Sequence, residues 1–441
     1  MRTVCNVENI DQKGVFMLKR LLSGASALVI LSACAVTENT EEATTEAVTE
    51  KVTTEARVVK TTARDDWGDF GIDLSSMNKA VKPGDNFYHY VNGTWIDEFE
   101  MPADRTRYGS FTLLAEKSEQ RVRHIIEDLA AEKASVDTLE GKVAAFFNAF
   151  MDEEAIEAAG LTPAQPYLDR IAAIKTREDL AKVMAATGFS SPVGGFVNID
   201  SKQTDRYIFY MGTSGLGLPN KDYYFETDEK TAEIRKAYND YLVTLLTAAG
   251  YDDPARGGTL VMSLETEIAG SHWDRAIGRN RNLTYNLVSA DDLSAMGSGF
   301  PVALFLSELG LGGETEFVVR QVTPTAEEIE AEGLSEEDAE KLGEGVAGIL
   351  RTMQTAPLES WKAYLTAHFL SDHAPVLPKA IDDANFEFYS KTLRGQEEQR
   401  ERWKRGVSAI SATLGDAVGK VYVERHFPAC LLYTSPSPRD S

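Results

Sequence analysis

The sequence predicts a mainly α-helical protein with one small β-hairpin. Apolar residues recur at three- and four-residue spacing in five separate segments, and such stripes are typical of helices that face a core. These segments are residues 122–129, 143–150, 234–245, 260–268 and 403–414. The chain has no internal repeat and no regular alternation of strand and helix patterns. A parallel α/β sheet is therefore not expected.

The strand signal comes from two short runs rich in aromatic and β-branched residues. Residues 196–199 read Phe-Val-Asn-Ile, and residues 207–210 read Tyr-Ile-Phe-Tyr. The polar segment between them contains Asp200 and Asp205. Two such runs separated by a polar connection predict an antiparallel hairpin.

The composition is that of a soluble globular protein, with 43% hydrophobic and 26% charged residues in 441. The formal net charge of −24 excludes nucleic acid as an expected partner, because phosphate binding requires a basic face. The cysteines are Cys5, Cys34 and Cys430, so none falls within residues 35–429. A disulfide framework or a thiolate metal site is therefore not expected in that region.

The beginning of the chain is interpreted as an export signal. Residues 17–33 contain a basic start, a short apolar run and small residues, which is the pattern of a signal peptide. The following Cys34 ends a Leu-Ser-Ala-Cys stretch that resembles a bacterial lipobox, so we expect Cys34 to be lipidated. Ala35 is not the aspartate of inner-membrane retention, which favours the periplasmic side of the outer membrane. A plain secretory signal with an incidental cysteine is the alternative.

The segments on either side of this signal are not expected to fold. Residues 1–16 fit no signal pattern and are interpreted as a mis-called leader, with Met17 as the true start. Residues 34–66 consist mainly of Thr, Glu, Ala and Val, without an aromatic residue or a helical stripe. Such a segment cannot offset the entropy of ordering, so we expect a lipid-anchored disordered tether.

A motif at residues 85–95, Asp-Asn-Phe-Tyr-His-Tyr-Val-Asn-Gly-Thr-Trp, resembles the opening signature of the neprilysin and endothelin-converting-enzyme peptidases. Further matches follow in the same order as in that family, and together they span residues 70–429. They are Pro102, residues 107–111, 150–152, 215–219, 222–224, 264–266, Trp273, Arg275, 284–286, 386–389, 402–404, 414–415 and 419–423. The match fades within residues 297–356. The acidic run there, at 326–338, is interpreted as a solvated helix face or an insertion.

The resemblance implies that residues 67–429 form the large helical cover domain of a bacterial zinc peptidase. Several of its motifs are expected to be structural. Gly215 and Gly217 are expected at positive φ before Pro219. Tyr223 and Tyr224 are expected to anchor the loop by burying their rings. The tryptophans Trp95, Trp273 and Trp403 are expected in the core.

The resemblance also implies a zinc site that this sequence does not contain. The family uses a helix with H-E-x-x-H, in which both histidines bind the metal and the glutamate activates water. The six histidines are His89, His124, His272, His368, His373 and His426, and no pair stands four apart. His368 and His373 are five apart and are interpreted as part of a surface loop after a helix. We therefore expect zinc in the full-length protein and none bound by this chain.

One substrate contact is carried over from the resemblance. In relatives, the arginine of an Arg-Tyr-Gly-x-Phe motif binds the free carboxylate of short peptides, and Arg107 occupies the matching position. A guanidinium suits this role because its planar fork binds a carboxylate through two hydrogen bonds. An ordinary salt bridge at the start of a helix is the alternative interpretation.

The family pattern ends near Ala429. Residues 430–441 match one reading frame of a transposase-type sequencing adaptor and are interpreted as an artefact. The first hypothesis is an N-terminal part of a secreted metallopeptidase that acts on peptides, inactive without its C-terminal catalytic lobe. The second is a non-catalytic helical lipoprotein that binds peptides or acts as a scaffold. Its membrane contact would be the lipid on Cys34 in either case.

Overall fold

The computed structural model describes residues 74–132 and 134–427. The expected leader, signal peptide, lipidated Cys34, tether and adaptor-like end all lie outside these residues. The chain divides into two compact units, and the division falls between Thr94 and Trp95.

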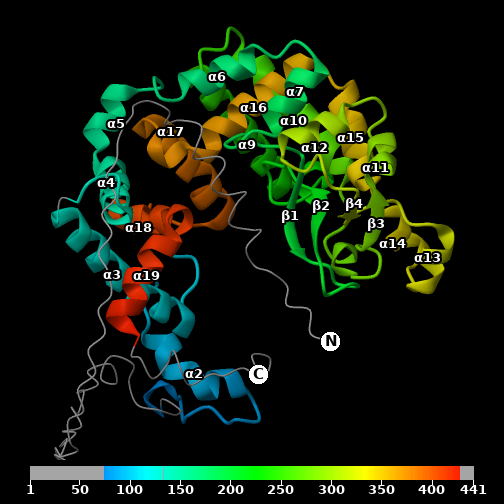
Figure 1. Cartoon of the computed structure of the whole chain (residues 1–441). Helices are drawn as coiled ribbons and strands as arrows, with labels where there is room; N and C mark the ends of the chain where they lie inside the picture. Colours follow the sequence, from blue (N-terminus) through cyan, green and yellow to red (C-terminus); the bar gives the residue numbers. More distant parts are fainter. Residues whose placement is uncertain (1–73, 133, 428–441) are drawn as a thin grey trace, which may run out of the picture. The chain divides into compact units, whose positions relative to one another are not determined.

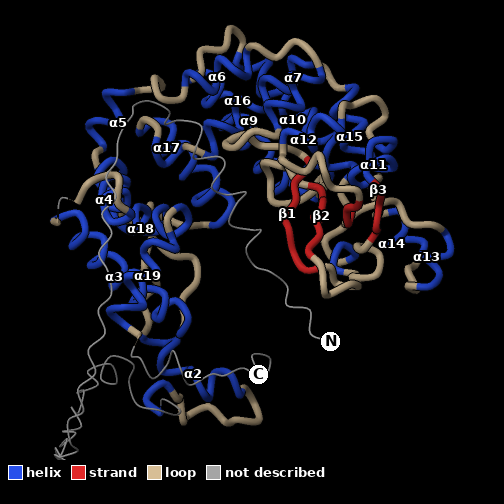
Figure 2. Tube along the Cα trace, viewed as in Figure 1, coloured by secondary structure: helices blue, strands red, loops and turns tan. Residues whose placement is uncertain are grey.

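The prediction of a mainly helical fold with a small sheet is confirmed (Figures 1 and 2). The helices are α2 (Phe87–Glu98), α3 (Ser110–Ala131), α4 (Leu139–Met151), α5 (Glu153–Ala159), α6 (Gln165–Ala172), α7 (Arg177–Met184), α8 (Asp222–Phe225), α9 (Glu229–Ala248), α10 (Pro254–Ser271), α11 (Ala290–Met296), α12 (Val302–Glu308), α13 (Ala326–Ala331), α14 (Glu336–Glu340), α15 (Gly345–Thr355), α16 (Leu358–Asp372), α17 (Lys379–Asn385), α18 (Arg402–Thr413) and α19 (Gly415–His426). Short 3₁₀ turns cover Leu74–Ser76, Ile277–Arg279 and Ala374–Val376, and a π-helical stretch covers Phe386–Thr392.

In the first unit, the loop after Leu74–Ser76 closes on the first turns of α2. The backbone N–H of Asn78 donates to the carbonyl of Tyr90 at 3.0 Å, and the Thr94 hydroxyl donates to the carbonyl of Met77 at 3.0 Å. A Cβ atom added at Gly93 would lie 2.6 Å from Cβ of Asn78. The glycine of the Asn-Gly-x-Trp motif is thus required by a close approach of backbone to loop.

The largest core of the second unit is built around α9, α10 and α16, which pack together (Figure 1). The predicted apolar stripes at 234–245 and 260–268 lie on α9 and α10 and are buried. The largest fully buried side chains of this core include Trp361, Tyr238 and Tyr364. Aspartates begin both helices, because the carboxylates of Asp228 and Asp253 accept the free backbone N–H groups of the first turns.

The predicted hairpin is confirmed and belongs to a four-stranded sheet in the order β1-β2-β4-β3 (Figure 2). Strands β1 (Val193–Ile199) and β2 (Tyr207–Thr213) pair antiparallel. Strands β3 (Asn286–Ser289) and β4 (Glu316–Val319) are four residues each, too short to give an alternating pattern. The β2–β4 contact is parallel and spans two residue pairs, which the sequence pattern does not predict.

The connection between β1 and β2 is fixed by the buried carboxylate of Asp200. It accepts the backbone N–H groups of Lys202 and Gln203, the Tyr285 hydroxyl at 2.8 Å and the Arg206 guanidinium at 2.9 Å. Burial opposes the charge, but these donors outweigh it and hold the pKa of Asp200 at about 2. The aspartate that marks the turn in the sequence is therefore also its structural centre.

A second core joins α3, α4, α18 and α19, four helices that come from opposite ends of the chain. The predicted stripes at 122–129, 143–150 and 403–414 meet here. Trp403 is half-buried, and the Arg123 guanidinium lies 4.2 Å from the centre of its ring. Trp273 is buried as expected, but Trp95 is 36% exposed and its core assignment is wrong. The Trp95 ring stacks on the Phe99 ring with 4.7 Å between their centroids, so one face of Trp95 is covered although the side chain is not buried.

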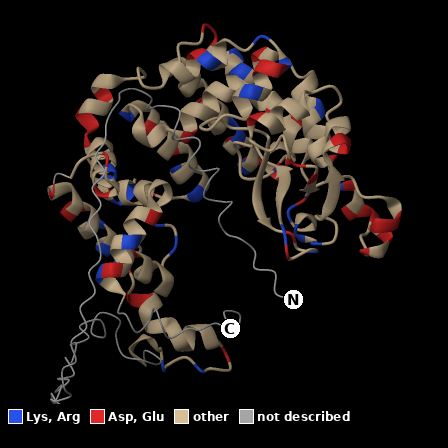
Figure 3. Ribbon diagram, in the orientation of Figure 1, with Lys and Arg blue, Asp and Glu red and all other residues tan. Residues whose placement is uncertain are grey.

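The acidic segment forms α13 and α14, which carry no buried residue and are rich in carboxylates (Figure 3). A small third core holds the segment in place. In this core Leu334 and Leu342 pack against Trp273, Ile277 and Leu283. The interpretation as a solvated helix face is therefore correct. Of the helices in residues 74–132 and 134–427, none combines the length and apolarity needed to cross a membrane.

Candidate functional site

The loop that carries Arg107 lies between α2 and α3, and residues 102–109 are called the Arg107 loop below. Residues 104–112 of this region line a pocket of about 620 Å³ together with Ala115, Gln396 and Arg400. Arg105 and Arg107 line this pocket, and so does Phe111 of α3, which is 89% exposed. The Arg107 loop and the start of α3 therefore present both cationic and apolar groups to the same pocket.

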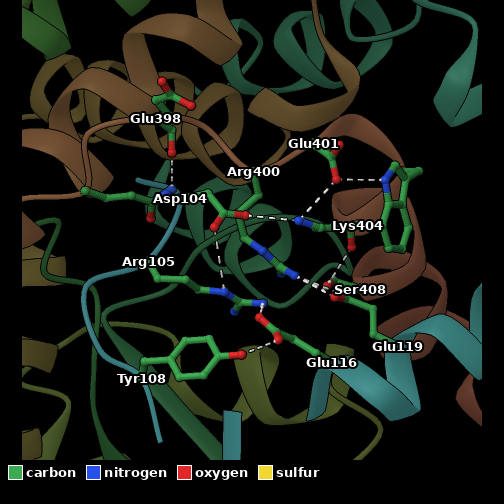
Figure 4. Close-up of polar contacts among 12 residues, drawn as sticks. Asp104, Arg105, Tyr108, Glu116, Glu119, Glu398, Arg400, Glu401, Lys404 and Ser408 are labelled. Carbon is green, nitrogen blue, oxygen red and sulfur yellow. Dashed lines mark hydrogen bonds and ion pairs between the residues drawn. The ribbon is translucent and has the colours of Figure 1, made fainter. Parts of the chain in front are cut away.

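Arg105, rather than Arg107, makes the ion pair that holds this loop to α3. The guanidinium of Arg105 lies 3.0 Å from one carboxylate oxygen of Glu116. The Tyr108 hydroxyl donates to the other oxygen at 2.7 Å (Figure 4). The hydrogen bond to the Glu116 carboxylate raises the pKa of Tyr108, so this hydroxyl stays a donor at neutral pH.

Residues from the start of α18 hold the other side of the loop (Figure 4). Lys404 Nζ lies 3.2 Å from the carboxylate of Asp104 and 3.1 Å from that of Glu401. Burial lowers the pKa of Lys404, but these two carboxylates outweigh burial and the pKa is raised. Arg400 binds both carboxylate oxygens of Glu119 on α3, at 2.7 and 2.9 Å.

Arg107 itself is exposed. Across residues 74–132 and 134–427, no side chain forms a hydrogen bond or ion pair with its guanidinium. The ordinary salt bridge considered for this position is made two residues earlier, by Arg105. Arg107 is thus an exposed cation in the lining of a pocket, and its neighbours Arg105 and Tyr108 are both bonded to Glu116. Its role toward a substrate stays a prediction.

A second loop of the motif series, residues 214–221, is called the glycine loop. Gly215 has φ 83°, as predicted, and its carbonyl accepts the Tyr364 hydroxyl at 2.9 Å. The same prediction is wrong for Gly217, which does not have positive φ. A Cβ atom at Gly217 would lie 1.7 Å from the Tyr238 hydroxyl, so close packing is what requires this glycine.

Glu265 on α10 is the centre of the support under the glycine loop, and it is fully buried. One of its carboxylate oxygens accepts Gly217 N–H at 3.2 Å and the Tyr224 hydroxyl at 2.6 Å. The other accepts the Tyr238 hydroxyl at 2.9 Å and lies 2.7 Å from His368 Nε2. Burial raises the pKa of both tyrosines, so both remain donors. The expected burial of Tyr224 is confirmed, while Tyr223 is half-buried.

The outer side of the glycine loop lines a pocket of about 510 Å³ with residues 272–275, Gly278, Arg279 and Gln321. His272 Nε2 lies 3.2 Å from the carbonyl of Ser214. Burial, reinforced by the nearby charge of Lys221, lowers the pKa of His272 to about 4, so the ring is neutral at pH 7. Lys221 Nζ donates to the carbonyls of His272 and Lys341, which ties the loop to the segment around α14.

The surface-loop interpretation is wrong for His368, whereas His373 does lie in the turn directly after the helix and is partly buried. His368 lies within α16 and faces Glu265, while His373 ends the same helix and stacks on Phe369 at 4.3 Å. Over the part of the chain that the structure describes, no three His, Cys, Asp or Glu side chains are grouped to hold a metal ion. A zinc site does not fit these residues, because His368 and Glu265 are already committed to a hydrogen-bonded cluster with two tyrosines.

Sequence reasoning missed the Glu265 cluster, although a signal for it exists. Glu265 stands between Leu264 and Ile268 on the apolar face of a predicted helix. A glutamate in such a position is rarely buried without partners, so several donors had to be expected around it. The identity of those donors could not be read, because they lie 27 to 103 residues away in the chain.

Comparison with known proteins assigns the chain that carries these loops to a family. A family model described as "Peptidase family M13", covering its N-terminal part, matches residues 83–430. The chain therefore belongs to peptidase family M13, which comprises zinc metallopeptidases.

The relatives agree with this assignment. Endothelin-converting enzyme 1 of Cavia porcellus is 26% identical over 366 residues, covering 80% of this chain and 46% of that protein. The Homo sapiens enzyme is also 26% identical, with 45% of its length covered. The inhibitor complex of zinc metalloprotease Zmp1 from Mycobacterium tuberculosis matches with a TM-score of 0.71 and 33% identity, covering 81% of this chain and 52% of that one. PepO from Lactobacillus rhamnosis HN001, at 16% identity and a TM-score of 0.63, shares the fold. The chain spans about half the length of the relatives it matches.

Proposed function

We propose that this chain is the N-terminal, helical part of a zinc metallopeptidase that cleaves peptides. The observation that carries the proposal is the family match over residues 83–430 in a chain that spans about half of its relatives. The remaining half would supply the H-E-x-x-H helix and the third zinc ligand. By itself the chain would cover substrates and hydrolyse none.

The sequence of the gene beyond the codon for Ala429 tests this proposal. An H-E-x-x-H motif in the same reading frame supports it, and peptide hydrolysis by the complete protein should then be abolished by a chelator. An in-frame stop codon near Ala429 would contradict it and favour the non-catalytic peptide-binding lipoprotein. Tight zinc binding at one ion per chain in protein ending at Ala429 would also contradict it.

Within the complete protein, we propose that Arg107 binds the free C-terminal carboxylate of short peptides. The support is that Arg107 is exposed in the lining of a pocket, pairs with no carboxylate of the described residues, and lies on a loop held by Arg105, Tyr108 and Lys404. Arg107→Ala should reduce kcat/KM for a free-acid peptide by roughly 10- to 100-fold, as expected for loss of a charge-assisted pair worth about 1.5–3 kcal/mol.

The matched measurement uses the same peptide with an amidated C-terminus. Its cleavage should change little, because the amide carries no charge for Arg107 to bind. Arg107→Lys should recover part of the loss, since a lysine keeps the charge but not the two-pronged geometry. Equal losses for the acid and the amide would show that Arg107 does not recognise the carboxylate.

We further propose that Cys34 carries a lipid that anchors the protein on the periplasmic side of the bacterial envelope, at the outer membrane. The support is the sequence pattern of residues 17–34 alone. Metabolic labelling with a fatty acid should mark the parent protein and leave Cys34→Ser unlabelled. Labelling of Cys34→Ser to the same extent would refute the assignment.

A further inference from the structure

The outer edge of the sheet is unusual in its composition. Among the residues that the structure describes, strand β1 pairs with β2 on one side only and is therefore an edge strand. Its sequence, Val-Gly-Gly-Phe-Val-Asn-Ile, contains no charged residue and no proline. Natural edge strands are commonly protected by charges, proline or bulges, because their free N–H and C=O groups can pair with another strand. Strand β1 has none of these protections, but side chains bond the outward groups at its two ends. The Val193 N–H donates to Ser191 Oγ, and the Ile199 N–H donates to Asn198 Oδ1. Gly195 and Val197, beside the middle of the strand, therefore present the free backbone groups.

Side chains on the hairpin are also exposed although they are apolar. Val197 is 61% exposed, Ile199 is 47% exposed and Tyr207, opposite Ile199, is 74% exposed. These residues lie on one face of the hairpin, because successive side chains of a strand alternate between faces. A contiguous apolar surface of this kind is typical of an interaction site rather than of a solvated face.

This face of the hairpin adjoins an apolar pocket of about 490 Å³. The pocket lies between β1, the segment after α7 and the end of α12, and is lined by Val197, Phe209, Met211, Phe189, Phe305 and Leu309 among others. None of its lining residues is charged. Its volume is within the range of pockets that take a ligand group, and its lining suits an aliphatic or aromatic one.

Gly195 explains how the pocket floor is made. A Cβ atom at this position would lie 2.3 Å from Cζ of Phe209 and 2.3 Å from the carbonyl of Tyr210. The ring of Phe209, from the neighbouring strand, therefore covers the place where a β1 side chain would stand. Gly194 is exposed and adds no side chain either. The strand edge beside the pocket is thus bare backbone, which permits close approach by another chain.

We propose that β1 binds an extended peptide segment by strand addition, with one large apolar side chain of the peptide in the pocket beside Val197. The peptide is taken to be a substrate-like chain, so the inference rests on the proposed peptidase function. Backbone groups of β1 supply affinity and the pocket supplies selectivity for an apolar residue. A second copy of this chain is a poorer occupant, because two chains of net charge −24 repel each other.

The test measures binding and requires no catalysis. The probe is a fluorescent peptide of about eight residues with alternating Thr and Leu, long enough to lie along β1, and both of its ends are blocked. The blocked C-terminus removes the carboxylate that Arg107 would recognise. Binding to the full chain should weaken by about tenfold or more with Val197→Asp, and likewise with Leu309→Asp, because each places a charge at the pocket.

Leu287→Asp on β3 is the matched control. Leu287 is 42% exposed and Leu309 is 38% exposed, so the two substitutions cost folding about equally, yet Leu287 lies on the opposite edge strand. The control should bind the peptide as the parent does. Circular dichroism of all variants identifies any that do not fold. If one of the two pocket variants does not fold, the peptide affinity of the other tests the site.

Modified peptides test the backbone part of the proposal. N-methylation of every second amide removes alternate hydrogen-bond donors, and the two possible registers should differ by about tenfold in affinity, since only one faces β1. Equal binding by both registers would overturn strand addition. If both pocket variants bind the peptide with the affinity of the parent chain, the proposed site is wrong. The site is also wrong if β1 mediates self-association of the chain and binds no peptide. If peptide does not bind while the complete protein still cleaves it, this inference fails and the proposed function stands.

Discussion

The glycine loop and the Arg107 loop are held in place by different means. Under the glycine loop, a single fully buried carboxylate, Glu265, gathers donors from α8, α9 and the loop itself, and contacts His368 on α16. Beside the Arg107 loop, separate ion pairs are spread over a partly solvated surface, with side-chain exposures of 19% for Arg105 and 31% for Glu116. The first arrangement concentrates its interactions in one group and the second distributes them.

This difference teaches how much each contact can contribute. A buried donor that loses its acceptor suffers its whole desolvation cost, whereas a half-exposed donor can turn to water. The glycine loop should therefore depend strongly on one residue, and the Arg107 loop weakly on several. The following substitutions test that contrast.

Glu265→Ala should have the largest effect. It leaves the Tyr224 hydroxyl, the Tyr238 hydroxyl and Gly217 N–H without an acceptor. Each orphaned buried donor costs about 1–3 kcal/mol, so the free energy of unfolding should fall by at least about 3 kcal/mol. Urea unfolding followed by circular dichroism measures this. The exposed Glu233→Ala on α9 is the control and should stay within about 0.5 kcal/mol of the parent. A similar small loss for Glu265→Ala would contradict the central role of this carboxylate.

His272 should give the glycine loop a pH dependence. Its pKa is about 4 in the folded chain and 6.5 in the unfolded chain, because burial disfavours the charged ring. Below pH 6.5 the unfolded state therefore binds a proton that the folded state does not. The free energy of unfolding consequently decreases as the pH is lowered from 6.5 toward 4. The loss should reach about 3 kcal/mol near pH 4.

Comparison with His272→Gln isolates this contribution from the carboxylates that titrate in the same range. Glutamine can still donate to the carbonyl of Ser214 but does not titrate. Between pH 6.5 and pH 4, urea midpoints of the variant should fall less steeply than those of the parent. Parallel curves would mean that His272 is protonated equally in both states.

Arg105→Ala should cost about 1 kcal/mol, because Glu116 keeps the Tyr108 hydroxyl and the lost ion pair is partly exposed to solvent. The loss should shrink when the salt concentration is raised, since solvent ions screen partly exposed charges. The loss from Glu265→Ala should not. If both losses respond to salt alike, the contrast between buried and distributed support does not hold.

Arg107→Ala should have the smallest effect on stability, within about 0.5 kcal/mol, because no described side chain pairs with it. Its effect should appear in cleavage of free-acid peptides by the complete protein. A loss of stability as large as that of Arg105→Ala would instead make Arg107 part of the loop support.

The long helices and the hairpin could be predicted because each displays its period over many residues. α9 and α10 are examples, with buried residues at helical spacing over 20 and 18 residues. Strands β3 and β4 could not be predicted, since four residues do not establish a period. Trp95 was expected in the core as part of a structural motif, but its ring stacks on Phe99 and is 36% exposed.

The position of Arg107 followed from a motif, but the support around it did not. The pair between Asp104 and Lys404 joins residues 300 positions apart, and the pair between Glu119 and Arg400 joins residues 281 apart. Local sequence contains no information about such partners. His368 shows the same limit, because its placement depended on Glu265, which lies 103 residues earlier on another helix.

The acidic segment that contains α13 and α14 begins and ends at neighbouring positions in the fold. Val322 and Gly345 pair with each other, and Gly345, with φ 62°, turns the chain directly into α15. Since both ends are pinned together and its apolar contacts belong to the small core of Leu334 and Leu342, a change in its length is absorbed locally. The exposed carboxylates of α13 and α14 can therefore vary in number, provided that Glu332 keeps its bonds from Asn280 and Asn282 and the carbonyls of Lys341 and Gly343 keep those from Lys221 and Trp273.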